Sequence, residues 1–325
     1  MTNPDRAKEF LESSFLSSLL QKETVTDISY NGESIFYEDA GKGRRKSGIN
    51  VPSDEVGSFL RQIANFCEKQ FSYMNPILDV SFGKYRLNAS FLNLTRVYDR
   101  KSYSFSLRIG RMGSAVSGDK EFFPANTKAL LLEGLNKGES IVIAGETGAG
   151  KTELQKYLLM QLPDATRVIV IDNIGELGLS RGDEMIDMTV WAVDEHFQDA
   201  TFPALIKNAL RNNPDYLIVA ESRGAEMLSA LNAVMSGHPI ITTLHAKDIH
   251  AIPYRMARMA QSGDKNLVYE DLMMDIFHHF SLMVYVRKQK REGGIYRHIS
   301  ALGRVNEATR EIDMLYDEDK AGEKK

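Results

Sequence analysis

The stretch from Ser140 to Thr152 reads S-I-V-I-A-G-E-T-G-A-G-K-T, and it decides the fold of this chain. Its second part, Gly145-Glu146-Thr147-Gly148-Ala149-Gly150-Lys151-Thr152, matches the phosphate-binding pattern G-x-x-x-x-G-K-[ST] at every fixed position. Small residues let the backbone wrap a phosphate, the lysine reaches its outer oxygens, and the threonine hydroxyl suits Mg²⁺. We call Gly145–Thr152 the P-loop and predict that it binds Mg-ATP. No N-K-x-D tetrapeptide follows to read guanine, so ATP is favoured over GTP.

The context of the P-loop predicts the architecture around it. An apolar strand precedes the loop, and an apolar-periodic helix follows it. Further apolar runs alternate with helical stretches downstream, at Val168–Ile171, Leu217–Ala220 and Ile240–Leu244. Continuous apolar strands separated by helices indicate a mostly parallel sheet covered on both faces. The fold class is therefore α/β, with a RecA-like P-loop core.

The residues before the P-loop predict a separate, smaller N-terminal α+β domain over residues 1–110. Asn31-Gly32 favours a hairpin turn, and Val56 to Cys67 shows the spacing of an amphipathic helix. Strands are expected over Ile77–Phe82, Tyr85–Asn88 and Tyr103–Arg108. Residues 111–127, rich in Gly, Ser and charge at their start, are interpreted as a linker. Residues 128–325 then form the ATPase domain.

Composition limits the partners and the compartment. The 325 residues carry a net charge of −4, which gives no support to a strong nucleic-acid-binding surface, so no direct nucleic-acid partner is expected. No apolar run reaches the roughly 18 residues of a membrane span, so no transmembrane segment is expected. Cys67 is the single cysteine, which excludes an internal disulfide or a cysteine-cluster zinc site and suits a reducing compartment.

Acidic and histidine side chains at strand ends are the candidate catalytic residues. Glu221 follows the strand Leu217–Ala220, where a carboxylate is placed to hold Mg²⁺ or to polarise the attacking water. Asp172 follows Val168–Ile171, with Glu176 four residues later. These acids supply a metal-side ligand and a general base, and the sequence leaves open which is which. His245 follows Ile240–Leu244 and is placed to sense the γ-phosphate.

Four segments taken together resemble the secretion ATPase superfamily, whose members power type II secretion, type IV secretion, conjugation and pilus assembly. They are G-E-T-G-A-G-K-T, I-D-N-I-G-E-L, N-P-D-Y-L-I-V-A-E-S-R-G-A-E and S-G-H-P-I-I-T-T-L-H-A-K. They correspond to the Walker A, aspartate-box, Walker B and histidine-box segments of that family. Upstream, Pro76–Val80 and Gly83–Ala89 resemble its N-terminal domain, so the resemblance extends over residues 25–305.

The resemblance implies further residues and partners. By matching position, Arg86 and Arg108 are the N-terminal arginines that approach the nucleotide, with Arg96 and Arg111 behind them. It also implies a homo-oligomer, a ring of six subunits, with Mg²⁺ and ATP as cofactor and substrate. The expected location is cytoplasmic, at the inner face of the cytoplasmic membrane, where the ring docks on integral membrane components of a secretion or pilus machine.

The chain departs from the family pattern at defined places. The aspartate box usually reads Glu-Asp but here reads Asp172-Asn173, which shifts the expected base toward Glu221 or Glu176. Lys247 stands where Asn usually follows the His-Ala pair. A tetracysteine zinc module cannot exist with one cysteine. The resemblance is therefore closest to the type IV secretion and tight-adherence branch.

Two alternatives belong to other classes of protein. One is a RecA-like nucleic-acid motor, a helicase or DNA-packaging ATPase, against which the acidic composition counts. The other is a regulator that binds nucleotide without hydrolysing it, for which Asp172-Asn173 is the supporting feature. A steady-state ATPase assay with and without nucleic acid distinguishes the three.

Overall fold

The computed structural model describes residues 3–40, 42–110, 113–172, 175, 177, 186–194, 197–291 and 294–321. It divides into two compact units, Met1–Arg111 with Arg291–Ile295, and Met112–Lys290 with Tyr296–Lys325. No helix among the described residues is long and apolar enough to cross a membrane.

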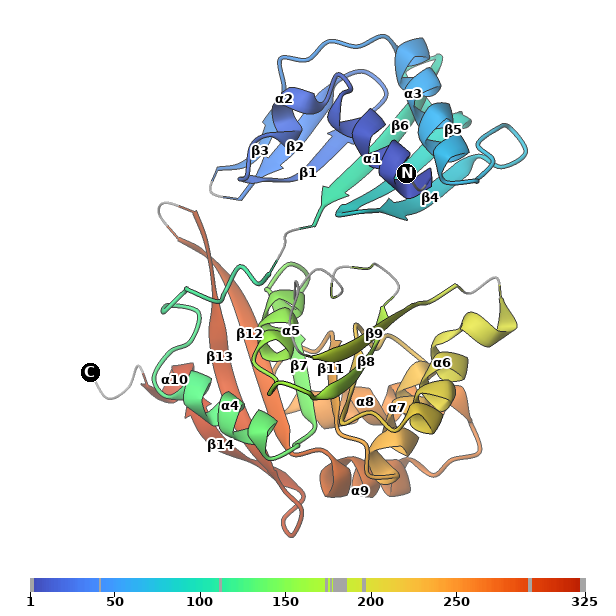
Figure 1. Cartoon of the computed structure of the whole chain (residues 1–325). Coiled ribbons are helices and arrows are strands. Elements are labelled where there is room, and N and C mark those ends of the chain that lie inside the picture. The colour runs from blue at the N-terminus through green and yellow to red at the C-terminus, as the bar shows by residue number, and fades with distance from the viewer. Residues whose placement is uncertain are drawn as a thin grey trace. The chain divides into compact units, whose positions relative to one another are not determined.

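The first unit is an antiparallel sheet with helices packed on it (Figure 1). Its elements are α1 (Asn3–Glu12), α2 (Ser17–Leu20), β1 (Val25–Tyr30), β2 (Ile35–Asp39), β3 (Gly43–Lys46), α3 (Ser53–Phe66), β4 (Ile77–Phe82), β5 (Tyr85–Val97) and β6 (Arg100–Ile109). The strand order is β3-β2-β1-β6-β5-β4. Apolar residues of α1 and α3 meet inward-facing residues of the strands in one core, which includes Leu11, Leu60 and Leu107.

Local chemistry explains the predicted hairpin in this unit. Gly32 has a φ of +101°, a conformation that glycine adopts without steric cost. Asn31 accepts hydrogen bonds through its side-chain oxygen from the backbone N–H groups of Glu33 and Ser34, at 3.0 and 2.8 Å. The turn therefore sets the antiparallel register in which Tyr30 opposes Ile35.

The second unit is a mostly parallel sheet between two layers of helices (Figure 1). Its elements are α4 (Thr127–Asn136), β7 (Ile141–Gly145), α5 (Lys151–Met160), β8 (Arg167–Asp172), β9 (Asp187–Ala192), η2 (Gln198–Ala200), α6 (Phe202–Ala209), η3 (Leu210–Asn212), β10 (Tyr216–Val219), α7 (Glu226–Met235), β11 (Ile240–Leu244), α8 (Ala251–Gly263), α9 (Tyr269–His279), β12 (Leu282–Arg291), β13 (Gly294–Asn306), β14 (Glu311–Asp317) and α10 (Glu318–Ala321). The strand order is β14-β13-β12-β7-β11-β10-β8-β9, and the predicted fold class is confirmed.

Alternation along β7 shows how the central strands are buried on both faces. Val142 and Ala144 enter the core shared with α6, α7, α8 and α9, whereas Ile141 and Ile143 enter the core shared with α4 and α5. β7 runs parallel to β11 on one side and to β12 on the other. The P-loop therefore leaves the sheet from an interior strand, at the carboxyl edge where open α/β sheets bind ligands.

Some elements differ from the sequence-based expectation. β5 continues to Val97 rather than ending at Asn88, because alternate burial persists beyond that residue. β9 and β14 were not expected, and β9 lies at the edge of the sheet with none of its residues fully buried. Residues 113–126, most of the expected linker, lie in the second unit, where Phe122 and Phe123 are buried beside α5.

Candidate functional site

The P-loop connects β7 to α5, and its backbone geometry favours glycine at more than one position. Gly150, just before α5, has a φ of +102°, which an L side chain rarely adopts. At Gly145 a Cβ atom would lie 2.3 Å from the carbonyl oxygen of Val286 on β12. The close approach of a neighbouring strand therefore adds a constraint to the loop beyond those of phosphate binding.

Lys151 is held inside the loop rather than extended into water. Its Nζ donates hydrogen bonds to the carbonyl oxygens of Gly145 and Glu146, at 3.0 and 3.1 Å, and its side chain is 8% exposed. Burial lowers the pKa of Lys151 below its ordinary value, and the nearby Glu221 carboxylate opposes that shift. A desolvated ammonium group interacts strongly with an anion that enters the loop.

Gln155 fixes the helix that carries Lys151. It is fully buried, and its side-chain N–H groups donate to the carbonyl oxygens of Val219 on β10 and Ile241 on β11, at 2.9 and 3.1 Å. These two bonds join α5 directly to two strands of the sheet. The orientation of the P-loop helix is thereby tied to the strands whose ends carry Glu221 and His245.

Glu221 lies just beyond β10 with its two carboxylate oxygens in different situations. Oε2 accepts hydrogen bonds from Arg223 Nε and Nη2, at 3.0 and 2.7 Å. Oε1 is buried, and no aligned hydrogen-bond donor for it is found in the described part of the chain. His245 Nε2 is 2.9 Å from Oε1, which is close enough for an ion pair but not aligned as a hydrogen bond. Glu221 therefore has one engaged oxygen and one oxygen with acceptor capacity to spare.

His245 joins the P-loop to the end of the sheet. Its Nδ1 lies 3.1 Å from the carbonyl oxygen of Gly145 and 3.3 Å from Lys151 Nζ, while Nε2 faces Glu221. One imidazole ring thus contacts the loop backbone, the loop lysine and the candidate catalytic carboxylate. A change at any of these three groups alters the surroundings of the other two.

Side-chain hydroxyl groups hold the ends of β10 and β11 together beneath this cluster. Thr243 donates to the carbonyl oxygen of Ala220 at 2.8 Å, and the hydroxyl groups of Ser222 and Thr242 are 3.0 Å apart. The backbone N–H of Ser222 also donates to the carbonyl oxygen of Thr243 at 2.8 Å. The separation of Glu221 and His245 is therefore set by buried contacts rather than by a mobile loop.

Asp172 ends β8 and is 2% exposed. Its Oδ2 accepts a hydrogen bond from the backbone N–H of Leu177 at 3.0 Å. This contact ties one carboxylate oxygen to the segment after the strand. Asn173, which follows Asp172, and Glu176, the other candidate acid of this box, lie outside the described residues.

Arg86 and Arg108 lie directly opposite each other on β5 and β6 of the first unit. Each is balanced by an acid, because Arg86 Nη2 is 3.4 Å from Asp79 Oδ2 and Arg108 Nε is 3.3 Å from Asp27 Oδ1. The structure therefore brings the two predicted arginines together on one sheet face. Arg96, also on β5, opposes Lys101 further along the strand, and Arg111 lies outside the described residues.

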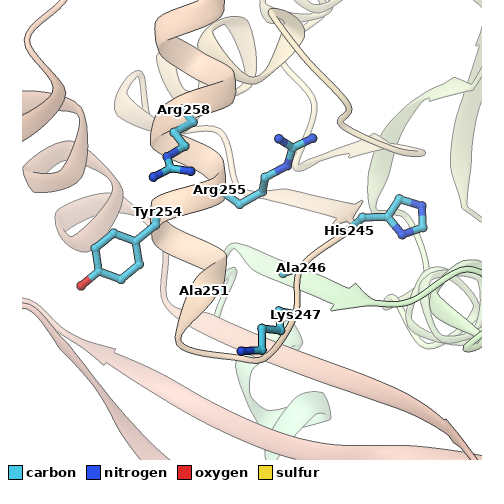
Figure 2. Close-up of a pocket in the computed structure, with 7 residues that line it drawn as sticks. All are labelled: His245, Ala246, Lys247, Ala251, Tyr254, Arg255 and Arg258. Atoms are coloured by element: carbon cyan, nitrogen blue, oxygen red, sulfur yellow. The ribbon is translucent and has the colours of Figure 1, made fainter.

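A pocket of about 420 Å³ opens where the chain leaves β11 and enters α8 (Figure 2). Its lining comprises His245, Ala246, Lys247, Ala251, Tyr254, Arg255 and Arg258. Arg255 Nη2 is 3.5 Å from the carbonyl oxygen of Arg223, the residue that pairs with Glu221. Because the lining contains cationic but no acidic side chains, the pocket makes the potential around this end of the sheet more favourable to anions.

Several residues of this arrangement carry no sequence signal. Arg223 follows Glu221 in the chain, but nothing in the pattern shows that it binds that carboxylate. Arg255 lies in a helical stretch at a position typical of the solvent-exposed face. Arg297 on β13 donates from Nε to the carbonyl oxygen of Gly148 at 2.8 Å across 149 positions of sequence. No local pattern predicts a contact of that separation.

Comparison with known proteins identifies relatives of this chain. A family model described as "Type II/IV secretion system protein" matches residues 107–274, about half of the chain. An uncharacterized protein of Bacillus anthracis is 30% identical over 260 residues, 77% of this chain and 56% of that protein. The type IV secretion system protein VirB11 of Brucella suis is 30% identical over 183 residues, 55% of this chain and 50% of its own length. The chain therefore spans about half the length of these curated relatives.

Solved structures share the fold. The Legionella pneumophila ATPase DotB has a TM-score of 0.67 at 20% identity, covering 95% of this chain and 83% of its own. The pilus retraction motor PilT with bound ADP has a TM-score of 0.65 at 18% identity, covering 95% and 85%. The Brucella suis VirB11 ATPase in complex with sulphate has a TM-score of 0.50 at 22% identity, covering 95% and 97%. At these identities the likeness shows the fold alone.

Proposed function

This chain belongs to the type II/IV secretion system protein family, and we propose that it hydrolyses ATP as a hexameric ring motor. The work done would be type IV secretion, conjugative transfer or pilus assembly, at the inner face of the cytoplasmic membrane. The observation that carries the proposal is the cluster of Lys151, Glu221 and His245, in which the imidazole contacts both the P-loop lysine and the carboxylate. The name of one relative, the type IV secretion system protein VirB11, supports the choice of machine.

The residues of the P-loop fit a nucleoside triphosphate. Lys151 is a desolvated cation that now rests on two loop carbonyl oxygens, and a phosphate oxygen is a stronger partner for it than a neutral carbonyl. The N-terminus of α5 adds a favourable dipole for an anion at the same place. In our proposal, therefore, Gly145–Thr152 holds the β- and γ-phosphates and Lys151 neutralises charge that develops as the terminal phosphate is transferred.

Glu221 is our choice of general base, because its Oε1 has spare acceptor capacity in a buried setting. A carboxylate in that state orients a water molecule and accepts its proton as the phosphorus–oxygen bond breaks. Asp172 is the second candidate, and its hydrogen bond to the Leu177 backbone gives it a structural task as well. His245, between Glu221 and Lys151, is placed to respond to the terminal phosphate.

The donor set also fits a magnesium ion, since a threonine hydroxyl and a carboxylate are oxygen ligands of the kind it prefers. Thr152 and Glu221 are the residues that would hold it, directly or through water. Bound there, Mg²⁺ would neutralise part of the phosphate charge.

The two-domain arrangement supplies the proposed motion. In our proposal residues 1–110 form the N-terminal domain and residues 128–325 the ATPase domain, with most of the expected linker 111–127 packed on the second unit through Phe122 and Phe123. Arg86 and Arg108 would approach the nucleotide as arginine fingers when the domains close. Because fingers and P-loop can come from different subunits, a closed ring is the assembly that gives every P-loop a complete set of contacts.

The proposal is tested by measuring steady-state ATP hydrolysis by the purified chain, with and without DNA or RNA. We expect hydrolysis that nucleic acid does not stimulate, and a sixfold particle in mass measurements with Mg-ATP present. Lys151→Ala serves as the blank that excludes a contaminating ATPase. Stimulation by nucleic acid would instead support the helicase or packaging alternative, and nucleotide binding without turnover would support a regulator.

A further inference from the structure

The P-loop has a second wall, formed by β12 and β13, that its sequence pattern does not describe. The carbonyl oxygen of Val286 lies 2.3 Å from where a Cβ on Gly145 would be, and Lys288 Nζ lies 3.6 Å from the same position on Gly148. Val286 and Lys288 are two residues apart on β12, so both side chains are on one face of the strand. The loop is therefore packed between its own helix and this pair of strands.

Arg297 on β13 makes a directed contact with the loop from this wall. Its Nε donates to the carbonyl oxygen of Gly148 at 2.8 Å, and its Cδ lies 3.7 Å from where a Cβ on Gly150 would be. The arginine stem therefore extends along the loop from Gly148 to Gly150. Both glycines have positive φ, +73° and +102°, so this is the part of the loop with the widest choice of backbone conformations.

The contact fixes the orientation of one peptide unit in the loop. In a trans peptide the C=O of Gly148 and the N–H of Ala149 point in opposite directions. With the oxygen turned toward Arg297, the Ala149 N–H points away from β13 and across the loop, where it donates to the carbonyl oxygen of Glu146 at 3.3 Å. A rotation of this peptide unit would carry an oxygen to the side that a phosphate group has to approach.

We propose that Arg297 is a positioning residue that holds the P-loop open in its phosphate-binding conformation through the Gly148 carbonyl. The proposal rests on the proposed function in one respect, namely that the loop binds phosphates. The expected effect is preorganisation. If the loop adopts its binding conformation only part of the time, its apparent affinity for the ligand falls in proportion to the fraction of time spent in that conformation. Arg297 acts through the loop backbone and not on the reacting atoms.

A pair of side chains with matched shape tests the hydrogen bond separately from the charge. In Arg297→Gln the amide nitrogen occupies the same position along the side chain as Arg Nε, so a donor remains while the charge is lost. Arg297→Met has the same length and offers no donor. Lys288→Gln removes a positive charge beside the same glycine, with no hydrogen bond to the loop recorded for that lysine among the described residues.

The first measurement is hydrogen–deuterium exchange of the full chain without nucleotide, followed over peptides that contain residues 145–152. We expect faster exchange in Arg297→Met, on the order of tenfold, and exchange near the wild-type rate in Arg297→Gln and Lys288→Gln. This readout needs no ATP hydrolysis, so it stands even if the proposed function fails, a failure that the wild-type ATPase assay would show by itself.

The second measurement is the split between KM and kcat for ATP. We expect Arg297→Met to raise KM about tenfold with kcat changed far less, because the bound phosphates restore the loop once they are in place. Arg297→Gln should restore KM. Equal exchange rates in Arg297→Met and in the wild-type protein would overturn the proposal. So would a KM defect shared by Arg297→Gln and Lys288→Gln, since that result would assign the effect to charge and not to the hydrogen bond.

Discussion

The cations that we propose for nucleotide binding are held in opposite ways in the two units. Lys151 is 8% exposed and surrounded by loop carbonyl oxygens, an imidazole and a nearby carboxylate. The Arg86 and Arg108 side chains are 32% and 56% exposed, and each forms an ion pair with an acid on its own sheet, Asp79 and Asp27. The lysine is fixed by the fold, whereas the arginines are held by surface contacts.

The difference indicates which half of the site is prepared in advance. Exposed ion pairs contribute about 0–1 kcal/mol, so an arginine can exchange its acid for a phosphate at small cost. A buried lysine cannot leave its partners at a comparable cost, because its charge would then be uncompensated in a desolvated site. In the proposed function, Lys151 therefore suits constant ligand binding, and the two arginines suit contacts that form and break during a cycle.

Lys151→Ala removes the buried cation and has the largest expected effect. Turnover should fall by more than about 10³-fold, to below detection, because a phosphate-directed charge is lost from a desolvated position. The thermal unfolding midpoint and circular dichroism should stay close to wild type. Lys137→Ala, at an exposed lysine that follows α4 and pairs with Glu133, is the matched control and should be fully active. Substantial turnover by a folded Lys151→Ala protein contradicts the proposed site.

Arg108→Ala and Arg86→Ala each remove one of the exposed cations. An arginine finger contributes about 10³-fold or more to turnover, so each change should lower kcat by roughly that factor while ATP binding persists. A surface arginine with no such role costs almost nothing. The comparison between halves fails if both variants turn over like wild type.

Mixing Arg108→Ala subunits with Lys151→Ala subunits sharpens the same point. Each mixed assembly would then contain intact arginines and intact P-loops on different chains. Recovery of part of the activity would mean that the two halves of one site come from neighbouring subunits. Activity that stays at the sum of the two separate proteins would place both halves on one chain.

Glu221→Gln and Asp172→Asn test the comparison between the two acids. Glu221→Gln should lower turnover by about 10²-fold and keep ATP binding, because the amide cannot accept the proton from water. Asp172→Asn should act mainly on stability, by about 1 kcal/mol, since it weakens a charge-assisted bond to the Leu177 N–H. The result is read from kcat, ATP affinity and urea unfolding, and the reverse ranking of the two kcat values would move the base to Asp172.

How much the sequence predicts depends on how local the determining pattern is. Four buried strands of the parallel sheet, β7, β8, β10 and β11, follow from continuous apolar runs, and the P-loop follows from its own spacing. β9, D-M-T-V-W-A, was missed although Val190 and Trp191 are residue types that favour strands, because the run is short and none of its residues is fully buried at the sheet edge. Phe122 and Phe123 were an available signal that the expected linker packs against a core.

The site divides along the same line. Strand-end placement brings Glu221 and His245 to one edge of the sheet, and the structure shows them 2.9 Å apart. The pairing of Glu221 with Arg223 depends on side-chain rotamers, which no spacing rule encodes. Arg297 reaches Gly148 only because β13 returns beside the loop at the end of the chain. Contacts made by distant segments of the fold are the part that sequence reasoning misses.

Asp27→Asn is the smallest expected effect and the sharpest test of how the exposed arginines are held. The substitution keeps the shape of the Asp27 side chain and removes the charge that faces Arg108 Nε at 3.3 Å. Because the Arg108 side chain is 56% exposed, we expect the free energy of unfolding to change by less than about 0.5 kcal/mol. Turnover should equal or slightly exceed that of the wild type, since the arginine has one competitor fewer for a phosphate.

Arg44→Gln, which removes a comparable surface pair with Glu38, is the control for a general loss of charge on this sheet. If Asp27→Asn instead lowers turnover as far as Arg108→Ala does, the acid holds the arginine in its working position. The arginine half of the site would then be as prepared as the lysine half.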